Sequence, residues 1–465
     1  MKKINKSALS LLLLVAIFFG VVSCQDDDSP DANPVNQWIF TEMDLWYFWR
    51  EEMPRDINQT LAPEAYFDNL LFPGDRFSII VSDFQNLINS LDGVTLEAGY
   101  EVSFFRETGT NNVIGAVTYV KDPSPAKDAG IRRGDLIEAV NGRSMDVDNF
   151  GSVFSETFQN HSITYLRFNE SSEVFEEQSS EFVVEQVIEN PNFLDSIYTS
   201  QNGKKVGYYV YNFFRRGVNG RSEYSEEMDD IFASFQSAGV EELILDLRYN
   251  GGGSVDAAAD LASLIAPGVS SEDNLYTNRW NPIVEEAITN DERFGPDFFI
   301  GKFLDKPFNI GAQLTADRVY ILTGNGTASA SELIINGLTP FMDVIIVGDT
   351  TVGKNVGSIP LEDAENENNN YGLLPITFQI ENSLGQSDYA NGFIPGPQYL
   401  VNELQIPLKP LGDVEEPLLA TALADIDGQL TGRKKAAQLS AYPTLLTSKE
   451  LKAFKNELIL DLPNQ

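Results

Sequence analysis

The spacing of apolar residues changes along the chain and separates it into regions of different predicted structure. Between residues 34 and 95, apolar and aromatic residues recur at helical spacing in VNQWIFTEMDLWYFWREE and AYFDNLLFPGDRF, which predicts a small helical domain. Between residues 96 and 183, GYEVSFF, NNVIGAVTYV and DLIEAVNG are short alternating or apolar runs typical of strands. One short helix, in SPAKDAG, is expected there and ends at Gly130.

Residues 184–430 carry longer apolar runs that are separated by helical patterns. KVGYYVYNFF, ELILDLR, RVYILT and DVIIVG are the expected strands. Continuous apolar strands that alternate with helices predict an α/β catalytic domain with a mostly parallel sheet covered on both faces. The fold class is therefore such a domain together with a β-rich domain and a small N-terminal helical domain. The stretch 431–465 shows two short helical patterns and is treated as a C-terminal extension.

The first residues have the layout of a secretory signal. Lysines are followed by an apolar run from Leu11 to Val22, which is too short to span a membrane. Ser23 and Cys24 resemble the lipobox of bacterial lipoproteins, in which the cysteine is lipidated. These features predict a signal peptide at 1–23 and a flexible tether at 24–33. The alternative is a buried thiol in an uncleaved helix.

The lipobox resemblance implies a bacterial envelope protein, anchored in a membrane through a lipid on Cys24. Acidic residues directly after the cysteine resemble a surface-export signal of some Gram-negative lipoproteins. The expected location is thus the cell envelope, with the outer membrane favoured and the choice between its periplasmic face and its surface left open.

Composition removes several function classes. A net charge of -37 argues against a nucleic-acid partner, because that binding needs Lys and Arg to neutralise phosphates. With one histidine and one cysteine, neither a paired-cysteine metal site nor an HExxH zinc helix can be built. A Ser-His-Asp triad would need His161, which lies in a strand-like stretch far from the glycine-rich turns.

Two glycine-rich turns follow predicted strands and carry candidate chemistry. The turn 246–254, DLRYNGGGS, has uncovered backbone N–H groups that suit an oxyanion hole, although it is also read as a simple anion-binding loop. The turn 324–332, GNGTASASE, places Ser329 between a strand and a helix, where the helix N-terminus stabilises negative charge. The simpler interpretation is that Ser329 or Ser331 caps the helix, with Glu332 in its first turn.

A third turn, 348–358, carries Lys354 among glycines. Its apolar neighbours Val352 and Val356 would favour the uncharged amine, which accepts a proton. Taken alone, an ordinary solvated lysine is the usual case at such a position.

Together, DLRYNGGG, TASASE and GDTTVGK resemble the C-terminal processing peptidases, also called tail-specific proteases. The 25-residue step from Ser329 to Lys354 fits the Ser/Lys dyad of that family, and NGFIPG and PLGDVEEPLLATAL resemble its later segments. The resemblance implies a serine endopeptidase without a metal or another cofactor. It also implies the roles of the nucleophile Ser329, the general base Lys354, and the oxyanion donors Ala330 and either Gly252 or Gly253.

The segment 124–145, SPAKDAGIRRGDLIEAVNGRSM, resembles a PDZ domain of the bacterial protease type. The preceding strand would then offer its free edge to a protein or peptide substrate, which adds as a further strand. The expected contact residues are Gly99, Tyr100, Glu101 and Val102. A PDZ fold that serves only as a lid is the alternative.

Two positions depart from the family pattern. Ser358 stands where many members have a glutamine that orients the lysine, and Gly251 replaces the usual proline of the DLR turn. These changes leave open a catalytically silent peptide-binding scaffold. A third possibility is a ligand-binding module like the retinoid-binding proteins of related fold. The sequence does not determine the oligomeric state.

Overall fold

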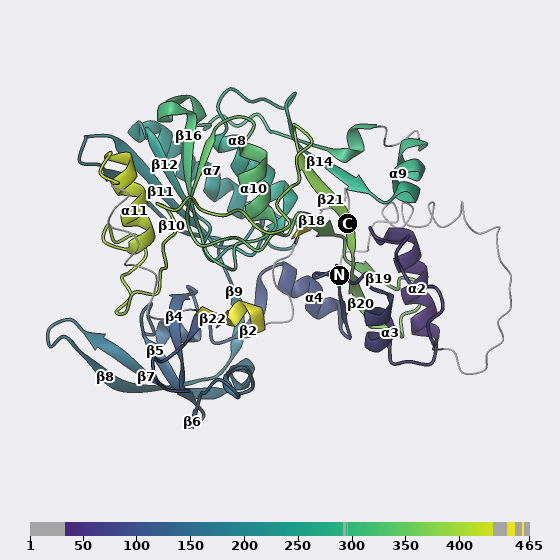
Figure 1. The fold of residues 1–465 in the computed structure, drawn as a ribbon, viewed down its shortest axis with the longest axis horizontal. Coiled ribbons are helices and arrows are strands. Elements are labelled where there is room, and N and C mark those ends of the chain that lie inside the picture. Colours follow the sequence, from purple (N-terminus) through teal and green to yellow (C-terminus); the bar gives the residue numbers. More distant parts are fainter. Residues whose placement is uncertain (1–32, 292–293, 295, 431–443, 452–457, 460–465) are drawn as a thin grey trace.

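The computed structural model describes residues 33–291, 294, 296–430, 444–451 and 458–459. Figure 1 shows N-terminal helices, a β-rich unit and a larger α/β unit packed side by side. Cys24, the predicted signal peptide and most of the predicted tether lie outside the described residues, as does most of the stretch 431–465. In the described part of the chain, no helix has both the length and the apolar character that crossing a bilayer requires.

The N-terminal helices are α2 (Pro34–Trp46), α3 (Pro63–Leu70) and α4 (Phe84–Leu91). Asn33 starts α2, because its side-chain oxygen accepts the N–H of Val35 at 3.0 Å. The buried apolar residues of α2 recur at a spacing of four and three and share one face: Ile39, Met43 and Trp46. The ring of Trp46 meets that of Trp280 edge-on, with centroids 6.1 Å apart, so this face packs against the α/β unit.

The β-rich unit contains a sheet in the order β22-β3-β4-β5-β7-β8. Its elements, with the short β6 and two helices, are β3 (Tyr100–Arg106), β4 (Val113–Val120), α5 (Pro125–Asp128), β5 (Leu136–Val140), β6 (Arg143–Ser144), α6 (Phe150–Phe154), β7 (His161–Asn169), β8 (Val174–Phe182) and β22 (Thr444–Thr447). The chain enters and leaves this unit through β2 (Val94–Glu97) and β9 (Glu185–Ile188), which pair antiparallel. We call this unit the PDZ-like unit.

The α/β unit is built on a sheet in the order β10-β11-β12-β16-β17. These strands are β10 (Asn192–Thr199), β11 (Lys205–Tyr211), β12 (Glu242–Asp246), β16 (Arg318–Thr323) and β17 (Asp343–Gly348). All neighbours pair parallel except β10, which runs antiparallel to β11. The predicted mostly parallel sheet is therefore confirmed.

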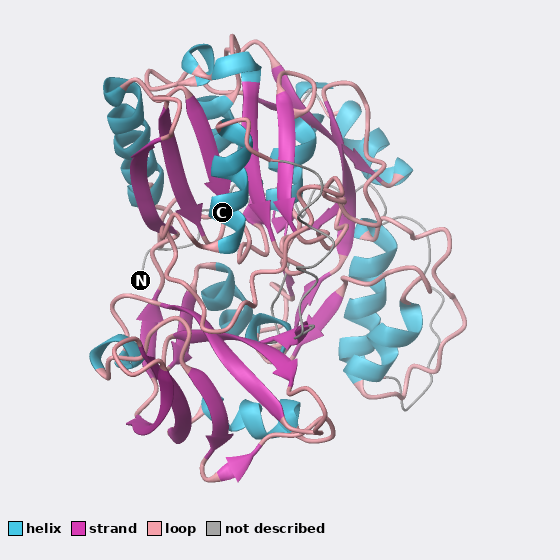
Figure 2. Cartoon of the chain, turned by 60° about the vertical axis from the view of Figure 1, so that its left-hand side comes forward, coloured by secondary structure: helices cyan, strands magenta, loops and turns pink. Residues whose placement is uncertain are grey.

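Helices cover both faces of this sheet, as Figure 2 shows from the side. Alternate strand residues point to opposite faces: Leu243 and Leu245 lie in one core and Ile244 in the other. The first core also contains residues of α7 (Glu223–Ala238), α8 (Val255–Ile265) and α10 (Ala330–Leu338). The second is closed by α11 (Pro417–Ile426).

A second sheet, which the sequence analysis did not predict, lies beside the parallel one. Its order is β13-β23-β18-β21-β14-β15. The strands are β13 (Gly253–Ser254), β14 (Asn274–Trp280), β15 (Ile300–Lys302), β18 (Val356–Ser358), β21 (Ile376–Asn382) and β23 (Leu458–Ile459). A small sheet of β1 (Ile79–Val81), β20 (Gly372–Leu374) and β19 (Leu361–Glu362), with helices α9 (Pro282–Thr289) and α12 (Ser448–Leu451), completes the main elements.

His161 has an ordinary structural role at the start of β7. Its two ring nitrogens lie 2.8 Å from the hydroxyl of Tyr100 and 2.7 Å from the carbonyl of Gln159. Burial lowers the pKa of His161 below its usual value, against the pull of that carbonyl. Both nitrogens are therefore occupied within the PDZ-like unit.

Candidate active site

The three glycine-rich turns lie side by side, because they follow the neighbouring parallel strands β12, β16 and β17 at one edge of the sheet. Backbone hydrogen bonds connect them directly. The N–H of Ala328 donates to the carbonyl of Asn250 at 3.2 Å, and that of Val352 donates to the carbonyl of Thr327 at 2.9 Å. The hydroxyl of Ser331 also donates to the Asn250 carbonyl, at 3.0 Å. The turns thus form one connected site.

Ser329 occupies the N-cap position of α10 in a backbone conformation that side-chain-bearing residues rarely adopt. Its φ of 65° and ψ of -115° place it in the left-handed half of the backbone map. Such a conformation costs of order 1–3 kcal/mol and is found mainly at functional sites. The side chain is fully buried, and Oγ makes no hydrogen bond in this structure. A strained strand-to-helix turn of this kind presents a nucleophile to the substrate side of the sheet.

Glu332, one turn into α10, holds the serine turn and the lysine turn together. Its Oε2 accepts the N–H of Ser329 at 2.8 Å and that of Lys354 at 2.7 Å. Its Oε1 accepts the N–H of Gly353 at 2.7 Å and the hydroxyl of Thr351 at 2.6 Å. Burial raises the pKa of Glu332 above its usual value, while these four hydrogen bonds favour its ionised form. From the sequence, Glu332 is predicted only as a first-turn helix residue.

Lys354 is fully buried, and its Nζ lies 5.1 Å from the ring centroid of Phe77. The segment after the dyad braces its turn: the N–H of Phe393 donates to the hydroxyl of Thr351 at 2.7 Å. The N-terminal unit contributes Arg76, whose guanidinium donates to the carbonyl of Gly353 at 2.9 Å. Arg76 and Phe77 belong to the predicted helical domain, and the sequence gives them no role at the active site. No local pattern indicates that they contact a turn so distant in the chain.

Ser358 lies in β18, four residues beyond Lys354. It is fully buried, and its hydroxyl makes no hydrogen bond. An unpartnered buried hydroxyl costs of order 1–3 kcal/mol, so it is unusual outside functional sites. Ser329 in the serine turn and Ser358 at the end of the lysine turn are thus two buried hydroxyls without a hydrogen-bond partner.

The glycine turn presents its backbone beside Ser329. Gly253 has a φ of 132°, and a Cβ there would lie 2.2 Å from the carbonyl oxygen of Phe214, so no larger residue fits. The N–H of Gly252 donates to the side-chain oxygen of Asn250 at 2.9 Å and is therefore engaged within its own turn. Ala330, the other predicted oxyanion donor, is the first residue of α10.

A buried ion cluster lies at the base of the glycine turn. The guanidinium of Arg248 donates from Nη2 to Asp246 at 2.8 Å and to Glu416, the N-cap of α11, at 2.9 Å. The hydroxyl of Tyr208 donates to Asp246 at 2.7 Å. Burial opposes ionisation of Glu416, but the charge of Arg248 outweighs it and keeps the pKa of Glu416 below its usual value. The cluster fixes the backbone that leads from β12 into Asn250.

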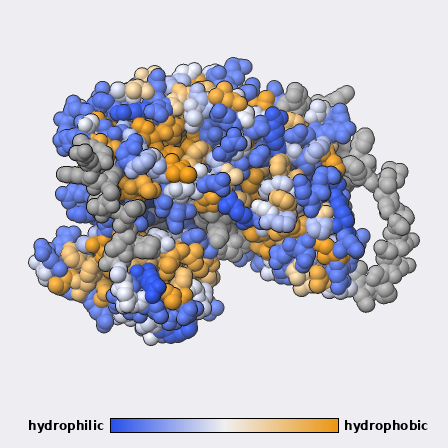
Figure 3. Space-filling model, in the orientation of Figure 1, coloured by the Kyte–Doolittle hydropathy of each residue, from blue (hydrophilic) through white to orange (hydrophobic). Residues whose placement is uncertain are grey.

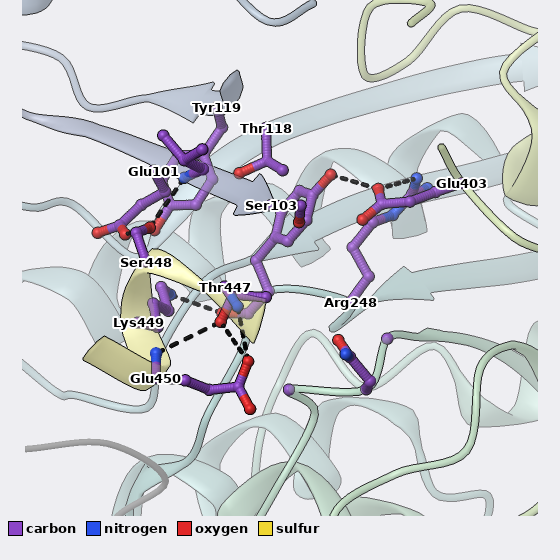
Figure 4. A pocket seen from close by; sticks show the side chains of 15 residues that line it. Glu101, Ser103, Thr118, Tyr119, Arg248, Glu403, Thr447, Ser448, Lys449 and Glu450 are labelled. Atoms are coloured by element: carbon purple, nitrogen blue, oxygen red, sulfur yellow. Dashed lines mark hydrogen bonds and ion pairs between the residues drawn. The ribbon is translucent and has the colours of Figure 1, made fainter. Parts of the chain in front are cut away.

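The predicted peptide-binding residues lie at the start of β3, some distance along the chain from the three turns. Tyr100 contacts His161, and the Glu101 carboxylate lies 3.2 Å from the buried Nζ of Lys121. The N–H of Val102 donates to the hydroxyl of Ser448 at 2.8 Å. Figure 4 shows Glu101 and Ser448 in a pocket whose lining reaches Arg248, so this region adjoins the ion cluster of the α/β unit. Gly99 precedes β3 with a φ of 90°.

Comparison with known proteins agrees with this arrangement. Three family models match the chain: Peptidase family S41 over 205–373, the Peptidase S41 N-terminal domain over 34–79, and a PDZ domain over 116–154. The carboxyl-terminal-processing protease of Picosynechococcus is 23% identical over 371 residues, which cover 76% of this chain and 81% of that protein. The protease of the same name from Synechocystis is 24% identical over 413 residues, covering 86% and 82%.

A solved structure from Bacteroides fragilis, assigned to the S41 proteases, is similar over most of its length. It is 28% identical, has a TM-score of 0.66, and the match covers 84% of this chain and 97% of that one. The fold and the family matches define a serine peptidase with a PDZ domain between its N-terminal and catalytic parts. The Peptidase family S41 match and the carboxyl-terminal-processing protease relatives support a C-terminal processing peptidase. The predicted family and enzyme class are therefore confirmed.

Proposed function

We propose that this peptidase cleaves its substrates with a dyad of Ser329 and Lys354. The observation that carries the proposal is the single carboxylate of Glu332, which accepts the backbone N–H groups of both residues on one oxygen. Because one buried carboxylate binds both turns, it holds the nucleophile and the base in a fixed position relative to each other. The strained, fully buried Ser329 supports the same assignment.

In the proposed reaction, the uncharged amine of Lys354 takes the proton of the Ser329 hydroxyl as Oγ attacks a peptide carbonyl. The N–H of Ala330 and one from Gly252 or Gly253 stabilise the tetrahedral oxyanion. The proton passes to the leaving amine, and the acyl-enzyme forms. Water, deprotonated by Lys354, then releases the acyl group and restores Ser329.

Two adjustments accompany substrate entry in this mechanism. Ser329 Oγ makes no hydrogen bond in this structure, so Nζ of Lys354 must approach it further, as catalytic groups commonly do on substrate binding. The buried hydroxyl of Ser358 is the group we assign to orient that amine, in place of the glutamine of many relatives. If Gly252 is a donor, its N–H must leave Asn250.

A fluorophosphonate probe and casein hydrolysis test the dyad. Ser329→Ala should abolish both, and Lys354→Ala should lower hydrolysis by about 10²–10⁴-fold, the usual contribution of a general base. Ser171→Ala, at an exposed serine after β7, is the control for the serine, and Lys409→Ala, an exposed lysine, is the control for the base. Hydrolysis that survives Ser329→Ala would refute the proposal. An increase of the rate at alkaline pH that disappears in Lys354→Ala would tie the base to this residue.

The PDZ-like unit is proposed to recruit an unstructured or C-terminal tail by adding it to the β3 edge near Gly99, Tyr100, Glu101 and Val102. One peptide, offered with a free and with an amidated C-terminus, tests whether the tail is read. Equal cleavage rates would contradict tail recognition while leaving the dyad untouched.

We also propose that Cys24 carries a lipid, which holds the enzyme in the bacterial envelope and sets exported proteins as its substrates. The sequence around Cys24 supports this part of the proposal. Incorporation of labelled palmitate into the full chain, and its loss in Cys24→Ala, is the expected result. Protease shaving of intact cells would then distinguish the outer surface from the periplasm.

A further inference from the structure

One segment of the chain occupies both places where a substrate would bind. We call residues 444–451 and 458–459 the docked segment; they form β22, α12 and β23. We propose that the docked segment is an intramolecular competitor that fills the PDZ edge and the active-site slot and must leave before an extended peptide enters. The proposal rests on the dyad and the PDZ edge described under Proposed function.

β22 lies on the free edge of β3 as a bound peptide would. It pairs antiparallel, with Thr444 opposite Phe105, Leu446 opposite Phe104 and Thr447 opposite Ser103. Beyond this ladder, the N–H of Val102, one of the predicted peptide contacts, donates to the side-chain hydroxyl of Ser448 in α12. Residues 103–105 are thus already paired to the protein's own strand, and the N–H of Val102 is already bonded to the docked segment.

Side chains of the docked segment also fill the apolar side of this edge. Leu446 and Leu451 pack against the core of the PDZ-like unit, which includes Phe104 of β3 and Val153 of α6. Leu451 lies beside Gly151 at the start of α6. Leu445, its neighbour in β22, points away and is 38% exposed. Leu446 and Leu445 therefore give two identical side chains on opposite faces of the same strand.

α12 then connects the PDZ-like unit to the glycine turn. The Nζ of Lys449 donates to the carbonyl of Tyr249 at 2.6 Å and lies 5.4 Å from the ring centroid of Tyr119. The hydroxyl of Ser448 donates to Glu101 at 2.5 Å. Tyr249 directly precedes Asn250, so the docked segment contacts the turn that holds the predicted oxyanion donors. Figure 4 shows Ser448 and Lys449 in this position.

β23 enters the active-site region itself. It pairs parallel with β13, placing Leu458 opposite Gly253, and on its other side it places Ile459 opposite Ser358. Gly253 is a predicted oxyanion donor and Ser358 follows Lys354, so β23 lies between the glycine turn and the end of the lysine turn. Ile459 is 6% exposed and packs with Leu87 and Leu374. Without β23, the edges of β13 and β18 would each accept an extended peptide.

On the face drawn in Figure 3, apolar patches lie between polar ones. The docked segment itself needs only weak contacts to compete, because it is tethered to the sites it fills. Because the docked segment is part of the chain, its effective concentration is of order millimolar, so modest contacts suffice to exclude a dilute substrate. Breaking one contact should therefore shift the competition measurably without unfolding the enzyme.

Leu446→Glu and Ile459→Asp in the full-length chain test the proposal, with Leu445→Glu as the matched control. Each test variant should lower the KM for a fluorogenic peptide by about fivefold or more, because the tethered competitor is weakened. Leu445→Glu should leave KM unchanged. An unchanged or higher KM in Leu446→Glu and Ile459→Asp, with an unchanged melting temperature, would overturn the proposal.

A synthetic peptide of residues 444–459 covers the case in which a variant unfolds. Added to the wild-type enzyme, it should inhibit competitively, and more strongly when added to Leu446→Glu. Absence of competitive inhibition in both would overturn the proposal.

Binding of a fluorescent peptide to Ser329→Ala separates this proposal from the proposed function. If Leu446→Glu strengthens that binding although neither wild type nor any variant hydrolyses peptide, the docked segment competes with substrate and the dyad is wrong. If wild type hydrolyses peptide but Leu446→Glu changes neither KM nor binding, the dyad stands and the competitor is refuted.

Discussion

Glu332 receives the backbone N–H of Lys354 at 2.7 Å on the same oxygen that receives the N–H of Ser329. The two turns that carry the proposed nucleophile and base are therefore positioned through one buried carboxylate. A carboxylate has the acceptor capacity for all four of its donors, which a neutral amide lacks.

Glu332→Gln should separate this positioning role from helix capping. One end of the glutamine amide is an NH₂ group, which would face two N–H or O–H donors and push one turn away. A misplacement of about 1 Å costs about 100-fold in rate. We expect kcat for peptide hydrolysis to fall by that order, with a parallel fall in fluorophosphonate labelling of Ser329.

Thr351→Val is the comparison for Glu332→Gln, because it keeps the carboxylate and removes one of its four donors, together with the acceptor of the Phe393 N–H. Its effect on kcat should be the smaller of the two. Equal activity of Glu332→Gln and wild type, measured at saturating substrate, would show that the carboxylate does not position the dyad.

The strain at Ser329 predicts an unusual stability difference between two inactive variants. Ser329→Ala keeps a Cβ at a φ of 65° and a ψ of -115°, whereas Ser329→Gly relieves the conformation. Relief of about 1–3 kcal/mol exceeds the roughly 0.5–1 kcal/mol of added chain entropy that glycine costs. Ser329→Gly should therefore melt at a higher temperature than Ser329→Ala in scanning calorimetry. The reverse order would mean that the turn carries no such strain.

Arg248→Ala should destabilise the enzyme far more than loss of an exposed arginine. Its guanidinium is almost wholly buried between Asp246 and Glu416, which would be left as uncompensated charges. Breaking a buried ion pair in this way costs about 3–5 kcal/mol. Arg279→Ala, which breaks an exposed pair with Glu381, should cost less than about 1 kcal/mol. Urea midpoints compare the two, and similar shifts would contradict the structural role of the cluster.

The three turns were predictable from sequence, because each follows an apolar strand and parallel strands bring their carboxyl ends to one edge. Ser329 and Lys354 were found for this reason, and the structure places their turns in contact. Glu332 was predicted as a first-turn helix residue, but its role in joining two turns was not, since its partners Thr351 and Gly353 lie beyond the next strand. No local pattern reveals which distant N–H groups a carboxylate will accept.

The second sheet and the docked segment escaped prediction for a related reason. Tyr276 in β14 pairs with Asn382 in β21, more than a hundred residues away, and β13 and β23 have two residues each. Strands so short carry no periodicity of their own. The position of Phe77 at the site could not be predicted either, because its contact with Lys354 depends on the tertiary packing of the N-terminal unit.

Glu42 on α2 predicts a pH dependence of stability that is separate from catalysis. Burial, followed by the negative charges of Asp363 and Glu365, raises its pKa from 4.5 to about 7. A folded-state pKa above the unfolded one means that its proton stabilises the fold at low pH, and that this contribution is lost as the pH rises through about 7.

Glu42→Gln removes this ionisation, so the variant should gain stability relative to wild type as the pH rises. We expect the difference in melting temperature, variant minus wild type, to grow steadily between about pH 4 and pH 8, the interval that spans both pKa values, 4.5 and about 7. Glu286→Gln, an exposed position on α9, is the control and should show no such trend. Because Glu42 lies on the N-terminal unit, kcat at a given pH should stay near the wild-type value while the melting temperature changes. A constant difference across the series would mean that Glu42 is ionised throughout and that burial on α2 does not hold its proton.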